Sequence, residues 1–193
     1  MSLKELTWEN HKSAERKEFA SILMSGSIDP FLYYKYLYNQ YYKYLALEAR
    51  VPLKELGVED IARCKYIRSD MKELEVTHGF YFEDDLILPS TLEYIEYCEQ
   101  KVPINSVWDE WNEDAEIEHM MTLVPHLYVR HFGDMYGGAM IAKKVPGMGM
   151  MYKFNEKDLL KAKVRAILTD DMADEANVCF EFAIKLFGEL VNE

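Results

Sequence analysis

Hydrophobic positions along the chain recur mostly every three or four residues, and the alternation of apolar and polar residues typical of strands is nearly absent. This spacing predicts amphipathic helices. A capping box at Ser2–Glu5 opens a helix that is expected to run to about Met24. Asp29-Pro30 then supplies an N-cap and a first helical residue for a tyrosine-rich helix that ends near Arg50.

Further helices are expected downstream, with loops between them that contain proline or glycine. Residues 80–89 are expected to form a loop, and Ser90, Asn155 and either Asp170 or Asp171 are expected to cap helices. The expected ranges are 59–75 (with an end near Gly79), 90–100, 106–121, 128–142, 155–168 and 170–191. We therefore predict an all-α fold, a single-domain multihelical bundle that covers residues 1–193.

The stretch from Tyr128 to Ala142 is expected to be one helix with an internal weak point. Gly133, Gly137 and Gly138 each cost roughly 1 kcal/mol relative to alanine in a helix interior. Because Gly133 and Gly137 are four residues apart, they lie on one face and leave a strip of bare backbone. Asp134 lies beside this strip. The pattern is compatible with close helix packing and a solvated aspartate, or with the approach of a flat ligand.

The composition fits one domain with a sizeable core, since 49% of the 193 residues are hydrophobic and 13% are aromatic. The net charge of −12 argues against a nucleic-acid binder, which normally has a basic face. Residues 143–165 differ from the rest, with seven basic side chains and only two acidic ones. This basic segment predicts either a solvated surface or a docking surface for an anionic partner. Its cations are Lys143, Lys144, Lys153, Lys157, Lys161, Lys163 and Arg165.

The three cysteines, Cys64, Cys98 and Cys179, are scattered and form no C-x-x-C motif, so they indicate neither a disulfide framework nor a zinc site. The chain shows no signal-peptide pattern and no apolar run long enough to span a bilayer. We expect a soluble protein without a membrane partner, in a reducing compartment such as a bacterial or host cytoplasm or a plastid stroma.

The segment from Tyr128 to Gly138, YVRHFGDMYGG, resembles the distal-helix signature of heme oxygenases, Y-x-R-x-L-G-D-x-x-G-G. The apolar position before the first glycine differs and is Phe132 here. In this family the glycines let the helix backbone lie against the porphyrin, and the aspartate holds a water network near iron-bound oxygen. The resemblance implies these roles for Gly133, Gly137 and Asp134.

The first helix carries His11, and a lone helical histidine is more often an ordinary surface or core residue than a ligand. Lys4 and His11 are two turns apart, so they are expected to share a face. Their surroundings, however, resemble the proximal helix of heme oxygenases, K-x-x-x-x-x-x-H-x-x-A-E. The resemblance implies that His11 binds the iron through a neutral imidazole, that Lys4 pairs with a propionate, and that Glu15 holds the other imidazole nitrogen, directly or through water.

Two further blocks carry the resemblance. Tyr44-Leu-Ala-Leu-Glu48 resembles the family's Y-x-A-L-E, in which the tyrosine hydroxyl joins the distal water network, and Arg130 is expected to assist that network. Lys161 and Arg165 lie on one helix face and match the family's pair for the propionates. On spacing alone, they could equally form a solvated basic face. The aromatic residue that the family places between them is Val164 here.

Two aromatic residues complete the implied heme site. Tyr128 opens the distal segment, and Phe180 falls where the family places a phenylalanine over the porphyrin. Three residues later, Ala183 replaces an asparagine that contributes to the water network in some relatives. Proton delivery is therefore expected to differ in detail from that of those relatives.

The resemblance runs from Lys4 to Leu190 and implies a heme oxygenase. Heme b is then both substrate and cofactor, and O2 with electrons from an external donor converts it to biliverdin, carbon monoxide and ferrous iron. Because Lys4, Lys161 and Arg165 match the pattern of α-cleaving members, the IXα isomer is expected. The basic segment would receive an acidic electron donor such as ferredoxin.

Other functions are compatible with parts of the sequence. The pairs Glu75/His78 and Glu116/His119 have the Glu-x-x-His spacing of a di-iron carboxylate oxidase, a function found on the same scaffold. A thiaminase-like relative would need an activated cysteine, for which no motif is present. A non-catalytic heme- or tetrapyrrole-binding protein would keep His11 and the basic residues but would not need Asp134.

Overall fold

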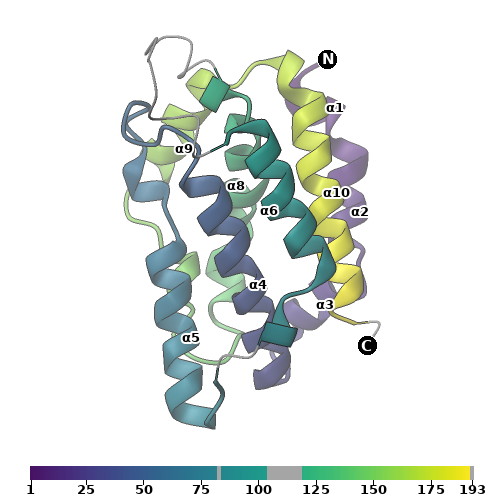
Figure 1. The fold of residues 1–193 in the computed structure, drawn as a ribbon, viewed down its shortest axis with the longest axis vertical. Helices are drawn as coiled ribbons and strands as arrows, with labels where there is room; N and C mark the ends of the chain where they lie inside the picture. Colours follow the sequence, from purple (N-terminus) through teal and green to yellow (C-terminus); the bar gives the residue numbers. More distant parts are fainter. Residues whose placement is uncertain (82–83, 104–118, 192–193) are drawn as a thin grey trace.

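The computed structural model describes residues 1–81, 84–103 and 119–191, and every regular element in these ranges is a helix (Figure 1). The central helix is α4 (Pro30–Glu48), which packs against α5 (Cys64–His78) and α6 (Pro89–Lys101). The prediction of an all-α bundle is confirmed for the described residues.

The second half of the bundle is built around α10 (Ala173–Glu189), which packs against α2 (Trp8–Glu15), α6 and α8 (Val124–Ile141). A shorter helix, α9 (Lys157–Ile167), packs on α8. Both α2 and α8 therefore share one neighbour, α10, and Figure 1 shows α2 and α10 side by side along one edge of the molecule.

The tyrosines of α4 explain its central position. Asp29 caps the helix, since its carboxylate accepts hydrogen bonds from the amides of Phe31 and Leu32 at 2.9 and 3.0 Å. Aromatic residues lie on several sides of this helix, so neighbouring elements cover most of its surface. Most tyrosines of α4 are core residues; those that are buried are Tyr33, Tyr34, Tyr36, Tyr38 and Tyr44.

The expectation of one continuous first helix to Met24 is wrong, because the chain forms α1 (Leu3–Leu6), α2 and α3 (Glu18–Ser25) in succession. The Thr7 hydroxyl donates to the carbonyl of Leu3 at 2.9 Å where α1 ends. Lys17 is extended, with ψ 144°, and separates α2 from α3. The capping box at Ser2 and Glu5 is present.

Two predicted helix starts in the middle of the chain also shift. Residues Glu59–Ile61 form a separate 3-10 turn, so α5 begins only at Cys64. Ser90 does not cap α6; the helix starts one residue earlier, and the Ser90 hydroxyl donates to Glu189 of α10 at 2.6 Å. The loop expected before α6 contains a 3-10 turn at Asp84–Leu86.

The predicted cap at Asn155 is wrong, because Glu156 precedes α9 in a left-handed conformation (φ 47°) and no side chain caps the helix. A 3-10 turn, η5 (Asp170–Met172), precedes α10, and the Asp170 carboxylate accepts from the Leu3 amide at 2.7 Å. The helix expected at 106–121 lies largely outside the described residues; residues 119–121 are helical.

Helix α8 is held in place by contact with η4 (Met150–Tyr152), a 3-10 turn. A Cβ added to Gly138 would lie 2.9 Å from Cβ and Cδ1 of Tyr152, which is too close for any side chain there. The turn itself is fixed by Asp70 of α5, whose carboxylate accepts from the amides of Met150 and Met151 at 2.7 and 2.8 Å. Gly138 is therefore a packing glycine.

All three cysteines are free thiols, as expected. Within the part of the chain that the structure describes, no helix is both long enough and apolar enough to cross a bilayer.

Candidate active site

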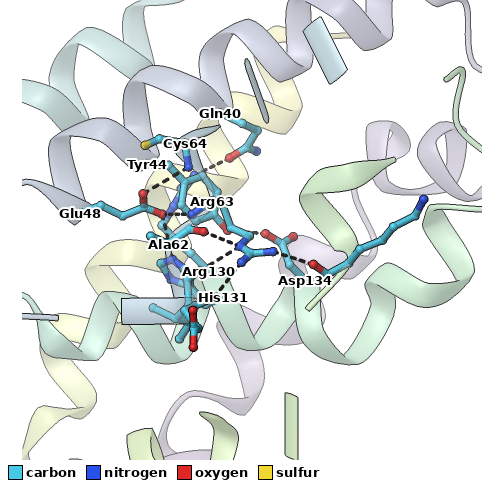
Figure 2. A network of polar contacts seen from close by, with 12 residues as sticks. Gln40, Tyr44, Glu48, Ala62, Arg63, Cys64, Arg130, His131 and Asp134 are labelled. Carbon is cyan, nitrogen blue, oxygen red and sulfur yellow. Dashed lines mark hydrogen bonds and ion pairs between the residues drawn. The ribbon is translucent and has the colours of Figure 1, made fainter. Parts of the chain in front are cut away.

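Three of the predicted site residues meet between α4 and α8: Tyr44, Arg130 and Asp134 (Figure 2). The Tyr44 hydroxyl donates a hydrogen bond to the Asp134 carboxylate. The Arg130 guanidinium lies over the Tyr44 ring, 4.6 Å from its centroid, and donates to the side-chain oxygen of Gln40. A cation, a phenol and a carboxylate are thus held in direct contact.

Burial gives this carboxylate unusual acid–base properties. Desolvation raises the pKa of Asp134 to about 6, although the hydrogen bond from Tyr44 and the charge of Arg130 oppose the shift. Burial also raises the pKa of Tyr44 well above its ordinary value, so its hydroxyl remains a hydrogen-bond donor. Asp134 can therefore gain and release a proton near neutral pH, as a general acid or base must.

A second network fixes the other side of Tyr44, and Figure 2 shows it beside the first. The Glu48 carboxylate accepts from the amides of Arg63 and Cys64 at 2.6 and 3.2 Å and lies 3.3 Å from Nε2 of His131. The His131 ring meets the Tyr44 ring edge-on, with centroids 4.8 Å apart. This network locks the orientation of Tyr44.

The members of this second network have pKa values opposite in direction to that of Asp134. Burial would raise the pKa of Glu48, but hydrogen bonds to His131, Cys64 and Arg63 outweigh it and lower the pKa. Burial lowers the pKa of His131, which favours the neutral ring. Glu48 is therefore a fixed anion that orients its neighbours.

The sequence interpretation gave no role to several of these residues. Glu48 lies in the quoted Tyr44–Glu48 motif, so its position carried a signal, whereas Gln40, Arg63 and His131 carried none. Arg63 is fully buried and donates to the carbonyls of Asp60, Ile61, Ala62 and Lys153, which ties the loop before α5 to the segment before α9.

Two glycines of α8 form the bare strip expected beside Asp134. A Cβ added to Gly133, which is exposed, would meet nothing within 4 Å. At Gly137 it would meet only Ile141 of the same helix, at 3.7 Å. Helix packing therefore explains Gly138 but not Gly133 or Gly137, which leave the backbone accessible.

His11 of α2 has one buried and one accessible side. Its Nδ1 atom is buried, has no hydrogen-bond partner and lies 3.6 Å from the Glu15 carboxylate, while 43% of the side chain is exposed. The ring lies edge-on to Phe180 of α10, with centroids 5.7 Å apart, and stacks on Trp8 at 5.8 Å. Because Nδ1 is buried, the exposed part of the ring includes the side that bears Nε2.

Lys161 and Arg165 lie on one side of α9 and reach toward α8. The Lys161 ammonium pairs with Asp158 at 2.6 Å and lies 4.6 Å from the ring centroid of Tyr136. The Arg165 guanidinium donates to the Tyr136 hydroxyl and lies 5.6 Å from the centroid of Phe132. The two cations therefore lie beside the helix that carries the glycine strip.

The remaining predicted site residues, Lys4 and Tyr128, have fewer contacts that tie them to the site. Lys4 is exposed on α1, a helix separate from that of His11, so the expectation that both lie on one continuous helix face is wrong. Tyr128 is partly buried on α8, edge-on to Phe132 at 5.6 Å.

The residues of the di-iron alternative do not assemble where they are described. Glu75 accepts from Tyr34 at 3.0 Å and pairs with Arg68 at 2.5 Å, while His78 is exposed and stacks on Phe80. Glu116 lies outside the described residues. Among those that are described, no group of three or more potential ligands could hold a metal ion.

The geometry thus defines a helical protein with an accessible imidazole on α2, a bare backbone strip and a titratable carboxyl on α8, and two cations on α9. Comparison with known proteins agrees: the family model described as Heme oxygenase matches residues 1–189. The chain belongs to the heme oxygenase family.

Individual relatives support the same assignment. The chain is 27% identical to a heme oxygenase of Guillardia theta and 26% identical to one of Rhodella violacea, over 98% of this chain and 85% and 86% of the relatives. The structure of heme oxygenase-1 from the cyanobacterium Synechocystis, in complex with heme, superposes with a TM-score of 0.76 at 21% identity, covering 98% of this chain and 90% of that one. The heme oxygenase of Leptospira interrogans gives 0.74 at 23% identity, covering 98% and 100%.

Replacement of Gly133 and of Gly138 in α8 by alanine should change the free energy of unfolding in opposite directions. Gly133→Ala should stabilise the free protein by about 0.5–1 kcal/mol, because the added methyl meets nothing and alanine is the better helix former. Gly138→Ala should destabilise it by about 1–3 kcal/mol, because the methyl collides with Tyr152. Urea unfolding of both variants measures the difference, and equal losses would show that Gly133 is also a packing residue.

Asp134→Asn should change stability in a pH-dependent way. The folded-state pKa of Asp134 is raised to about 6. The contribution of its protonated form to the free energy of unfolding is therefore fully present below about pH 4 and is lost as pH rises through 6. Above pH 7, where Asp134 is ionised, the Asn variant should therefore be the more stable by about 1–2 kcal/mol, and the gain should vanish near pH 4.

Glu48→Gln is the matched control, since the pKa of Glu48 is lowered and its contribution is lost as pH falls. It should destabilise the protein at pH 7, and the loss should shrink in acid. Denaturant unfolding at several pH values measures the stability of both variants. If both substitutions stabilised the protein at pH 7, or both destabilised it, the assigned pKa shifts would be contradicted.

Proposed function

We propose that this protein is a heme oxygenase that cleaves heme b at the α-meso carbon, with biliverdin IXα, carbon monoxide and ferrous iron as products. Membership of the heme oxygenase family makes the protein an oxidoreductase with heme as its substrate. The observation that carries the catalytic proposal is Asp134, a carboxyl with a pKa of about 6, beside the open backbone at Gly133.

The described residues fit a flat iron macrocycle with two carboxylates. The buried Nδ1 of His11 faces Glu15, which leaves Nε2 as the ligand nitrogen for iron. Phe180 provides an apolar surface beside that imidazole. The absence of a side chain at Gly133 and Gly137 gives a flat ring access to the backbone of α8.

The bound heme supplies both the iron that binds O2 and the carbon that is oxidised. The residues of the chain supply protons and fix the position of the substrate. Asp134 holds a proton at its carboxyl oxygen, and the Tyr44 hydroxyl keeps that oxygen in place. The Arg130 guanidinium lies over the Tyr44 ring and fixes it, so Asp134 would be held where it could order water and pass it a proton.

Regiochemistry follows from how the substrate is turned within its own plane. Lys161 and Arg165 offer cationic donors to the propionates from α9, and Lys4 offers a third from α1. Tyr128 belongs to the same aromatic face of α8 as Phe132. Lys161, Arg165 and Lys4 would hold the propionates and thereby set which meso carbon is oxidised.

A non-catalytic heme carrier is the competing function, because it would share His11 and the cations. It would not need a partly buried carboxyl whose raised pKa lies at about 6, held by a tyrosine and an arginine. The raised pKa of Asp134 therefore favours the enzyme.

Hemin titration tests the proposal directly. The wild-type protein should give a Soret band typical of histidine-ligated heme, and addition of ascorbate or another reductant in air should produce biliverdin. His11→Ala should lose this spectrum. Asp134→Asn should keep hemin affinity within about twofold yet lose at least about 90% of biliverdin formation, as expected when a single proton-transfer group is removed.

The converse results would decide against the enzyme. An unchanged spectrum in His11→Ala would move the iron ligand elsewhere, and full turnover in Asp134→Asn would remove the carboxyl from the mechanism. Mainly β or δ isomers on chromatography would contradict α-cleavage.

The electron donor is proposed to be a small acidic protein such as ferredoxin. Lys143, Lys153, Lys157 and Arg165 of the basic segment are exposed, so they can attract an anionic partner even though the whole chain is acidic. A reducing compartment, cytoplasm or plastid stroma, would suit the three free thiols.

Turnover with ferredoxin should slow several-fold between 20 and about 300 mM salt, since the Debye length shortens from tens of ångströms to a few. Turnover with ascorbate serves as the control and should change little. Equal salt dependence with both reductants would contradict docking by charge.

A further inference from the structure

Tyr136 of α8 has contacts that the proposed heme site does not yet use. It lies between Gly133 and Gly137 in the sequence, one turn after Phe132, and its side chain is 55% exposed. The Phe132 and Tyr136 rings meet edge-on, with centroids 6.1 Å apart. A large aromatic side chain therefore stands at the border of a strip that is otherwise bare.

Both cations of α9 lie against this one ring. The Lys161 ammonium lies 4.6 Å from its centroid and the Arg165 guanidinium carbon 5.8 Å from it. These distances are within the range of cation–π contacts. Tyr136 therefore contacts the positive ends of two long side chains on the α8 side of α9.

The phenol also has a donor to offer. Arg165 donates to the Tyr136 oxygen, which leaves the phenolic hydrogen free for a different acceptor. Three donors thus converge: the Lys161 ammonium, the Arg165 guanidinium and the Tyr136 hydroxyl. Within the described residues, the one anion paired with them is Asp158, whose side chain is 84% exposed and pairs with Lys161. Three donors in one place suit a carboxylate of the ligand.

We infer that Tyr136 is a specificity-determining residue, whose hydroxyl binds a substrate carboxylate together with Lys161 and Arg165 and whose ring positions both cations. This inference rests on the proposed function, since the carboxylate is a heme propionate. Tyr136 then limits rotation of the substrate within its plane, because its ring borders the strip on which the macrocycle lies.

Tyr136→Phe removes the hydroxyl and keeps the ring, so it separates the two roles. Hemin affinity, measured by Soret titration, should fall about five- to tenfold in this variant, as expected when one charge-assisted hydrogen bond is lost. Tyr136→Leu, which also removes the ring, should weaken binding further and should add a second biliverdin isomer to the product. The matched control is Tyr81→Phe, at an exposed tyrosine just past the end of α5, which should change neither quantity.

Hemin whose two propionates are methyl esters distinguishes carboxylate binding from a general effect on the fold. Wild type and Tyr136→Phe should bind the ester equally, since the charged acceptor is absent. Equal affinity of both proteins for unesterified hemin, with one product isomer in Tyr136→Leu, would overturn the role of Tyr136. Failure of the wild type itself to bind hemin would instead overturn the proposed function.

Discussion

The contact on which the site depends is the hydrogen bond from Tyr44 to Asp134. It joins the central helix α4 to α8. The Arg130 guanidinium covers the Tyr44 ring, and the His131 ring, which lies beside Glu48, meets the Tyr44 ring edge-on. Buried polar groups that contact one another strengthen or weaken together, so the cluster is expected to respond to substitution as one unit. The same burial raises the pKa of Asp134. A substitution that loosens the cluster would therefore also change the pKa of this carboxyl.

Much of the fold could be predicted from local signals. Asp29-Pro30 and Gly79 mark helix ends by their own conformational preferences, and the structure uses all three as expected. Two of the missed helix starts involve distant partners: Ser90 donates to Glu189, and the Asp170 carboxylate accepts from Leu3. A single sequence offers no sign of such contacts, and a hydroxyl that reaches another helix cannot also cap its own.

In the candidate site, too, some features follow from local sequence signals and others depend on contacts between distant residues. His11, Asp134 and the glycines occur in an order that resembles the family's motifs, so the sequence was enough to propose them for the site. The difference between Gly133 and Gly138 was not predictable, because it depends on where Tyr152 lies. Tyr136 also had no signal, since its partners Lys161 and Arg165 are brought to it only by the packing of α9 on α8.

The division of the N-terminal region into three short helices has a consequence for how easily α2 can open. Of the eight residues of α2, only Ala14 is fully buried, and α2 is secured mainly by its packing on α10, including a hydrogen bond between Asn10 and Asn177. Segments with few buried apolar contacts open at a small fraction of the global unfolding free energy. The helix that carries His11 is therefore expected to open locally at a lower free energy than the buried α4–α8 cluster.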